Sequence, residues 1–122
     1  MILVDTSVWI DHLRAGDAYL AALLTGSRVL MHPFVLGELA CGNLRNREQA
    51  LALLKALPKA SVASDGEVLF FIERHALMGR GIGYVDAHLL AAVTLSDMAR
   101  LWTRDKRLRM VANSLALAHK KD

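Results

Sequence analysis

Short apolar runs alternate along the chain with longer segments in which apolar residues recur every three to four positions. The runs at residues 2–4, 28–31 and 101–103 have the length and composition of buried strands. The longer segments are typical of helices that bury one face. Alternation of strands and helices predicts a parallel sheet covered on both sides. With weaker strands at residues 60–63 and 115–118, we expect an α/β fold with a central parallel sheet of four to five strands in one domain, residues 1–122.

Capping residues and turn formers set the expected helix bounds. Pro33 suits a first helical turn, where its missing N–H is not needed, while Asn46 and Asp65 can accept hydrogen bonds from free backbone amides. Glycines at 79, 81 and 83 predict a tight, mobile connection. The expected helices cover residues 8–13, 18–24, 33–41, 46–57, 65–77, 86–98 and 106–113, the sixth being buried throughout.

Asp5, Glu38 and Asp86 stand where an acid is otherwise unwelcome, and Asp105 lies just past the end of a strand. Asp5 follows a buried strand directly, and Asp105 follows the strand at 101–103. Ligands of parallel sheets bind beyond the carboxyl ends of the strands. Glu38 lies between apolar helix residues, and Asp86 begins an apolar helix. Burying an unpaired carboxylate costs several kcal/mol, so convergence of these groups would require a cation.

Oxygen-rich sites select hard cations, which favours Mg²⁺, with Mn²⁺ as a substitute. The chain has no cluster of Cys and His with zinc spacing. One or two Mg²⁺ ions bound by carboxylates can activate a water molecule and stabilise the charge that develops on a phosphodiester. The spacing is compatible with either number of ions.

Each acid also has a simpler interpretation. Asp5 and Asp86 can cap helices, Glu38 can be an exposed helix residue, and Asp105 can be a solvated turn residue. Position favours a functional role for Asp5, whereas Asp86 and Asp105, taken alone, fit the simpler roles. Only convergence of all four residues favours a joint site.

The overall composition fits a protein that works on a polyanion. A formal charge of +3 and a pI near 9.4 favour phosphate binding, for which Arg80, Arg104 and Lys106 are the candidates, although each can be a solvated surface cation. The single cysteine allows no internal disulfide, and no leader or membrane segment is visible, so we expect a cytoplasmic protein. The hydrophobic content of 54% is high for this size and predicts an apolar surface that meets a partner.

Four segments in order resemble the PIN-domain family, and most closely its VapC-type toxins. They are residues 4–11 (VDTSVWID), 35–39 (VLGEL), 83–92 (GYVDAHLLAA) and 101–105 (LWTRD). The resemblance implies a three-layer α/β/α fold, dependence on Mg²⁺ or Mn²⁺, and cleavage of RNA. It assigns the catalytic and metal-binding roles to Asp5, Glu38, Asp86 and Asp105, and supporting polar roles to Thr6, Ser7 and Thr103. It further implies a homodimer and a toxin that inhibits translation or growth. A cognate protein antitoxin is expected to silence this toxin by placing its tail in the groove near the acids.

Two other functions remain open at this point. A Mg²⁺-dependent phosphatase or phosphotransferase would use Asp5 as a nucleophile, but such enzymes are expected to carry a second acid near the first strand, and position 7 is Ser. A non-catalytic RNA-binding or interaction module would need the acids only as helix caps.

Overall fold

A parallel sheet of short strands lies at the centre of the computed structural model, which describes residues 1–120. Residues 121–122, the last two of the expected domain, lie outside the described range. The order is β2-β1-β3, in which β1 is Ile2–Val4, β2 is Val29–Leu30 and β3 is Arg100–Trp102. Leu3 pairs with Leu30 on one side and with Leu101 on the other. The central strand is therefore the one that ends at Asp5.

The prediction of four to five strands was wrong for the described residues, which form three strands and two isolated bridges. Residues 60–63 form no strand, because pairing stops after one bridge between Met31 and Lys59, and the amide of Ser61 donates instead to Ser96 Oγ. Residues 115–118 contribute only the bridge between Leu101 and Ala118. A φ of 59° at Ala116 puts that residue outside the extended region that a strand needs.

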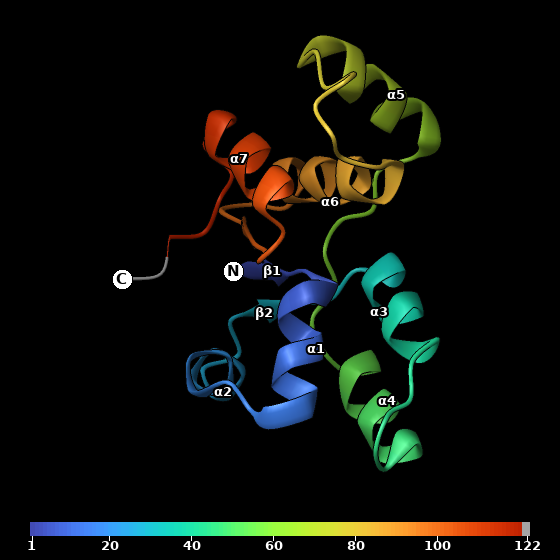
Figure 1. Ribbon diagram of the computed structural model, residues 1–122, viewed down its shortest axis with the longest axis vertical. Coiled ribbons are helices and arrows are strands. Elements are labelled where there is room, and N and C mark those ends of the chain that lie inside the picture. The colour runs from blue at the N-terminus through green and yellow to red at the C-terminus, as the bar shows by residue number, and fades with distance from the viewer. Residues whose placement is uncertain (121–122) are drawn as a thin grey trace.

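The helices agree with the predicted order and lie on both sides of the strands. Figure 1 shows the strands between α1 to α4 on one side and α5 to α7 on the other, which confirms the expected parallel sheet covered by helices. Among residues 1–120, none of these helices is long and apolar enough to cross a bilayer. The observed bounds are α1 Thr6–Ala15, α2 Ala18–Thr25, α3 Pro33–Ala40, α4 Arg47–Lys55, α5 Asp65–Arg74, α6 Tyr84–Leu95 and α7 Lys106–Ser114.

Helix starts and ends differ from the predictions in detail. The N-cap of α5 is Ser64 rather than Asp65, because Ser64 Oγ accepts from the amide of Glu67 in a capping box. Asn46 stands at the start of α4 with φ 48° and makes no side-chain cap bond. The expected burial up to Met98 was also wrong: α6 ends at Leu95, and Met98 is 79% exposed.

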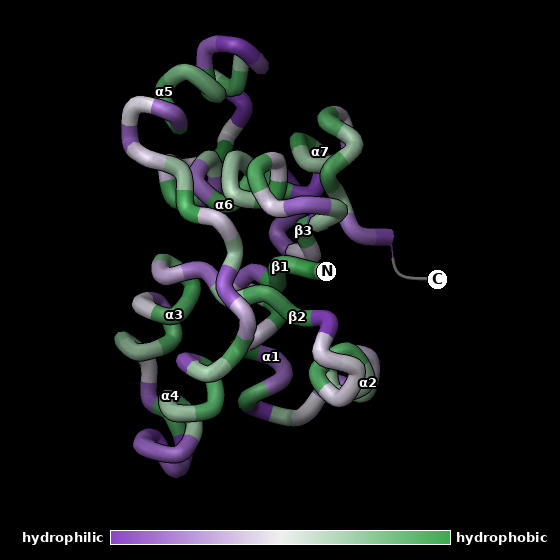
Figure 2. Tube along the Cα trace, turned by 180° about the vertical axis from the view of Figure 1, so that it is seen from behind, coloured by the Kyte–Doolittle hydropathy of each residue, from purple (hydrophilic) through white to green (hydrophobic). Residues whose placement is uncertain are grey.

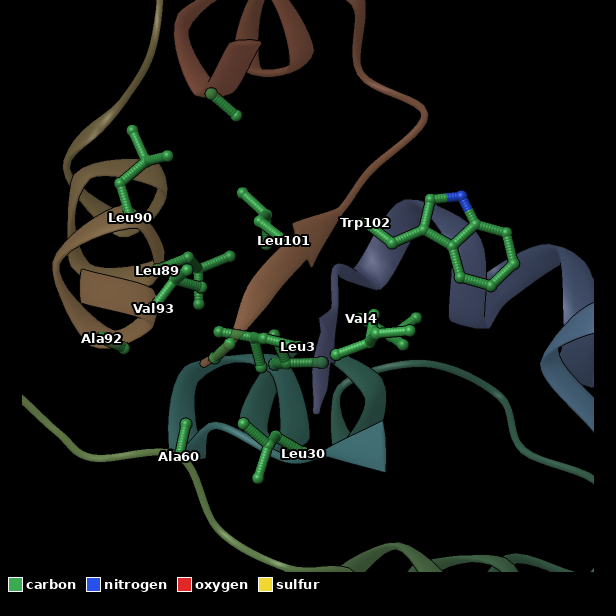
Figure 3. Close-up of a cluster of buried hydrophobic side chains, with 14 of the residues drawn as sticks. Leu3, Val4, Leu30, Ala60, Leu89, Leu90, Ala92, Val93, Leu101 and Trp102 are labelled. Carbon is green, nitrogen blue, oxygen red and sulfur yellow. The ribbon is translucent and has the colours of Figure 1, made fainter. Parts of the chain in front are cut away.

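The core forms where α6 packs on the strands. Leu3, Leu30 and Leu101 lie close together from the three strands, and Leu89 and Val93 point toward them from α6 (Figure 3). Residues 87–93 of α6 are all buried, as the apolar run predicted. The hydropathy colouring in Figure 2 shows β1 and β2 in green between the two groups of helices. This packing fixes the position of α6, and with it Asp86, relative to the end of β1.

A buried histidine begins α3. His32 has no exposed surface, and its Nδ1 accepts a hydrogen bond of 3.0 Å from the amide of Phe34, so the ring hydrogen of the neutral form is on Nε2. Burial, and secondarily the charge of His88, lower the pKa of His32 from 6.5 to about 4. The folded protein therefore holds this side chain neutral.

Acid is expected to destabilise the fold through His32. Its folded pKa lies below its unfolded pKa, so its contribution to the unfolding free energy is complete above pH 6.5 and is lost as the pH falls toward 4. The difference between the unfolded and folded pKa values of His32 corresponds to about 3 kcal/mol of unfolding free energy. Between pH 6.5 and pH 4, urea denaturation should show a smaller loss of unfolding free energy for His32→Asn than for the parent. The variant keeps an acceptor for the Phe34 amide but does not titrate. An equal loss in both proteins would assign the acid sensitivity to other groups.

Candidate active site

Asp5 is held at the carboxyl end of the central strand by two hydroxyl groups. Only 8% of the residue is exposed. Its Oδ2 accepts hydrogen bonds from Ser7 Oγ at 2.9 Å and from Thr103 Oγ1 at 2.7 Å. Asp5 occupies the N-cap position of α1, yet its side chain makes no cap hydrogen bond. Helix capping therefore does not account for this carboxylate.

The same hydroxyls connect β1 to the segment after β3. Thr103 Oγ1 accepts from the amide of Asp105 at 3.0 Å, and Ser7 Oγ accepts from the amide of Arg104 at 3.0 Å. Asp105 is the N-cap of α7, where its Oδ1 accepts from the amide of Leu108 at 2.9 Å. Asp105 is thus an exposed helix cap, and its amide is bonded to Thr103, the residue whose hydroxyl also binds Asp5.

Glu38 joins this region from α3. The residue is exposed on the helix, and its Oε1 accepts a hydrogen bond of 2.7 Å from Thr6 Oγ1 at the start of α1. Since Thr6 follows Asp5 directly, this bond brings Glu38 to the end of β1. Each of the three supporting polar residues contacts one of the four acids: Thr6 contacts Glu38, and Ser7 and Thr103 contact Asp5.

Asp86 completes the cluster from the first turn of α6. It is the third residue of the helix rather than its cap, and its Oδ2 accepts from the amide of Gly83 at 3.1 Å. Burial raises the pKa of Asp86, and the negative charges of Asp5, Asp105 and Glu38 raise it further, whereas the Gly83 hydrogen bond acts in the opposite direction. The charges of Asp5, Asp105 and Glu38 all act on Asp86, which supports a common location for the four acids.

The donor set of this cluster fits a hard, hydrated cation. It consists of four carboxylates with hydroxyls beside them, and the contacts of these acids within residues 1–120 include no thiol or imidazole. Within residues 1–120, no three acidic, imidazole or thiol groups stand close enough to enclose one ion directly. Mg²⁺ commonly keeps several waters and takes only one or two carboxylates, so this looser arrangement suits it better than a closed cage would.

The three basic candidates have different surroundings. Arg104 forms ion pairs with Asp11 at 2.5 Å and Asp17 at 2.6 Å, and its guanidinium lies 5.6 Å from the centre of the Trp102 ring. Arg80 is exposed, with a long contact of 3.5 Å to Ser114 Oγ. Lys106 is exposed at the start of α7 and forms no ion pair with another described residue. Arg80 and Lys106 therefore present less neutralised charge than Arg104 does.

Sequence reasoning missed a polar contact between α5 and α6. Asp65 Oδ1 accepts from the Tyr84 hydroxyl at 2.7 Å and lies 3.2 Å from His88 Nε2. The Tyr84 and His88 hydrogen bonds lower the pKa of Asp65. Periodicity places His88 in the buried helix, but it gives no signal for a partner 23 residues away. The contact helps to hold the first turn of α6, which carries Asp86.

Comparison with known proteins identifies the family. The protein-family model described as "PIN domain" matches residues 2–114, a span that includes all four acids. The chain belongs to the PIN-domain family. Two proteins named Ribonuclease VapC32, from two strains of Mycobacterium tuberculosis, are each 53% identical to this PIN domain over 109 residues, which are 89% of the chain and 88% of the relative. This likeness confirms the resemblance to VapC-type PIN domains found in the sequence.

Asp86→Asn is expected to stabilise the metal-free protein. Because the folded pKa of Asp86 is raised, stability increases as the pH falls through that pKa, and the charged form is destabilising above it. Thermal denaturation at neutral pH in EDTA should therefore give a higher Tm for Asp86→Asn than for the parent. Added Mg²⁺ should raise the Tm of the parent more than that of the variant.

Asp97→Asn is the matched control, because it removes the same charge from an exposed residue just beyond the other end of α6. It should leave both the Tm in EDTA and the response to Mg²⁺ as in the parent. A similar response in both variants would contradict the special environment of Asp86.

Proposed function

We propose that this chain is a Mg²⁺-dependent endoribonuclease that hydrolyses RNA phosphodiester bonds, with Mn²⁺ able to replace Mg²⁺. The observation that carries the proposal is the coupling of Asp86 to Asp5, Asp105 and Glu38. Like charges gathered in this way favour binding of a cation, and the chain's relatives are named as ribonucleases. A bound ion would supply Lewis acidity, activating water and neutralising charge on the phosphodiester.

The chain's own residues would position that chemistry. Asp5, Glu38, Asp86 and Asp105 would hold the ion directly or through water. The hydroxyls of Ser7 and Thr103 fix one oxygen of Asp5 and leave the other available. The Thr6 hydroxyl orients Glu38, and the Gly83 amide orients Asp86. Preorganised carboxylates lower the cost of collecting the ligands when the ion and the RNA bind.

Contacts to the RNA backbone would come from the basic residues around this cluster. Arg80 and Lys106 are exposed and suited to phosphate contacts. Arg104 has a smaller part in this proposal, because its guanidinium is already paired with Asp11 and Asp17. We expect loss of Arg80 to weaken RNA binding and to reduce its dependence on salt.

We further propose that the protein is the toxin of a toxin–antitoxin pair and acts in the cytoplasm, where RNA cleavage inhibits translation or growth. A groove of about 390 Å³ between α1, α3 and α4 supports a protein partner. Its lining includes the apolar residues Ile10, Leu13 and Leu39 together with Glu38. A segment of the antitoxin bound there would cover apolar surface and reach one of the four acids, which would block the site.

A homodimer is the second assembly that we propose. Leu69, Phe70 and Met78 are more than half exposed, and Phe70 lines a largely apolar groove of about 570 Å³ between α5 and α6. Apolar surface of this kind is costly in a monomer and is typical of an interface. In Figure 2 the hydrophobic stretch of α5 lies at the upper end of the molecule.

Phe70→Glu is expected to dissociate such a dimer, because it would place a charge in the apolar interface. The measurement is sedimentation velocity across a range of protein concentrations. Leu53→Glu is the control, since Leu53 is equally prominent, at 73% exposure, on the distant helix α4. A dimer that persists in Phe70→Glu, or that is lost only in Leu53→Glu, would contradict this location of the interface.

The phosphotransferase alternative is less well supported. Such an enzyme is expected to carry a second acid near the first strand, whereas Ser stands at position 7, and the relatives of this chain are named as ribonucleases. A non-catalytic module would not need a cluster in which Asp86 is held at an electrostatic cost.

Cleavage of RNA tests the proposed activity. Purified protein freed of antitoxin is incubated with total cellular RNA in Mg²⁺, in Mn²⁺ and in EDTA, beside Asp5→Asn, Asp86→Asn and the control Asp97→Asn. We expect discrete fragments that require metal, and a loss of turnover by orders of magnitude in Asp5→Asn and Asp86→Asn but not in Asp97→Asn. Cleavage that survives in either site variant would refute the metal-site mechanism, and hydroxylamine-labile phosphate on Asp5 would favour the phosphotransferase instead.

A further inference from the structure

The side chain of Arg107 lies across Gly81, in the loop that leads into α6. A Cβ atom added at Gly81 would lie 2.7 Å from Arg107 Cδ, 3.1 Å from Nη1 and 3.2 Å from Nε. These distances are shorter than ordinary contacts, so the arginine occupies the space that a side chain at position 81 would need. The φ of Gly81 is also +82°, a conformation that favours glycine.

This contact joins the two segments that carry Asp86 and Asp105. Arg107 is in the first turn of α7, two residues after Asp105. Gly81 precedes by two residues the glycine whose amide donates to Asp86. The Arg80 guanidinium approaches Ser114 of the same helix at 3.5 Å, which makes a second, weaker contact between the loop and α7. Arg107 therefore lies between the helix starts that present two of the four acids.

Among the residues that the structure describes, no acid forms an ion pair with Arg107. The ion pairs among residues 1–120 involve Arg104 and, only where its ring is protonated, His88, and Arg107 is exposed. A guanidinium can bind a phosphate through two parallel hydrogen bonds, whereas an ammonium acts as a point charge. Packing of its stem on Gly81 limits the conformations of the side chain, which lowers the entropy lost when an anion binds.

We propose that Arg107, seated on Gly81, binds a backbone phosphate of the RNA next to the bond that the four acids address. The proposal rests on the proposed ribonuclease function and assigns Arg107 a role in binding the substrate, separate from the metal chemistry. Gly81 then acts as a positioning residue, because its missing side chain allows the arginine to cross the loop.

The test measures binding rather than cleavage, so that its failure can be told apart from failure of the ribonuclease activity. All variants are made in the Asp86→Asn background, and fluorescence anisotropy follows a short, labelled, single-stranded RNA of random sequence over a range of KCl concentrations. Arg107→Ala should weaken binding several-fold at low salt and reduce the slope of log K against log salt by about 0.7, as expected for one lost phosphate contact on a single strand. Arg107→Lys should keep most of the slope but not the full affinity.

Arg109→Ala is the matched control for charge. Arg109 is exposed on the same helix, two residues further along, and it is Arg107 rather than Arg109 that lies against Gly81. We expect its loss to leave the salt slope unchanged. Equal effects of Arg107→Ala and Arg109→Ala would overturn the proposal in favour of a general effect of charge, and no salt-dependent binding by the parent would overturn it as well.

Two glycine substitutions test whether contact with Gly81 positions the Arg107 side chain. Gly79 and Gly81 both have positive φ, at 72° and 82°, but no atom lies within 4 Å of a Cβ added at Gly79. Gly79→Ala therefore reproduces the backbone strain without displacing the arginine, and urea denaturation of both variants measures that strain. Gly81→Ala should weaken RNA binding more than Gly79→Ala, and should have no further effect once Arg107 is Ala. A further loss of affinity in that double variant would refute the role of Gly81 as the seat.

Discussion

Repulsion between four carboxylates is the constraint on which the arrangement of this protein depends. Asp86 is held partly buried among the charges of Asp5, Asp105 and Glu38, which raises its pKa. Such a cluster persists only where other groups fix each acid, and here hydroxyls and backbone amides do so. The hydrophobic core stabilises the fold while the acids oppose it locally, as is common where function needs charge in one place.

The fold brings these acids together because its strands are parallel and adjacent. β1 and β3 end at the same edge of the sheet, so Asp5 and the segment after Trp102 meet there. The second half of α3 and the start of α6 reach that edge, because Thr6 contacts Glu38 and the core packs α6 on the strands. Local sequence thus sets each acid's position on its own element, and tertiary packing sets the distances between the elements.

The strong local patterns were sufficient to predict the elements and their order. The strands at residues 2–4 and 101–103 and the buried run of α6 followed from composition, because burial on both faces requires apolar side chains. The strands expected at residues 60–63 and 115–118 did not form, and a short apolar run does not reveal a positive φ such as that of Ala116. Asp65 and Ser64 were equally good cap formers by residue type, and only the geometry of the capping box distinguished them.

The four acids were predicted as a set only through family resemblance, because position alone favoured a special role for Asp5 but left Asp86 as an ordinary helix cap and Asp105 as a solvated turn residue. The supporting hydroxyl bond between Thr103 and Asp5 joins residues 98 positions apart, and no local pattern encodes such a pair. The seat of Arg107 on Gly81 was missed for the same reason.

A crystal structure of the protein grown with Mn²⁺, with the ion located by its anomalous scattering, tests the central claim most directly. The account predicts a peak inside the cluster, with Asp5 and Asp86 binding the ion directly or through one water and with Glu38 and Asp105 completing its surroundings. Ordered Mn²⁺ bound only at other residues, or a cluster that stays free of Mn²⁺ while the protein cleaves RNA, would contradict it.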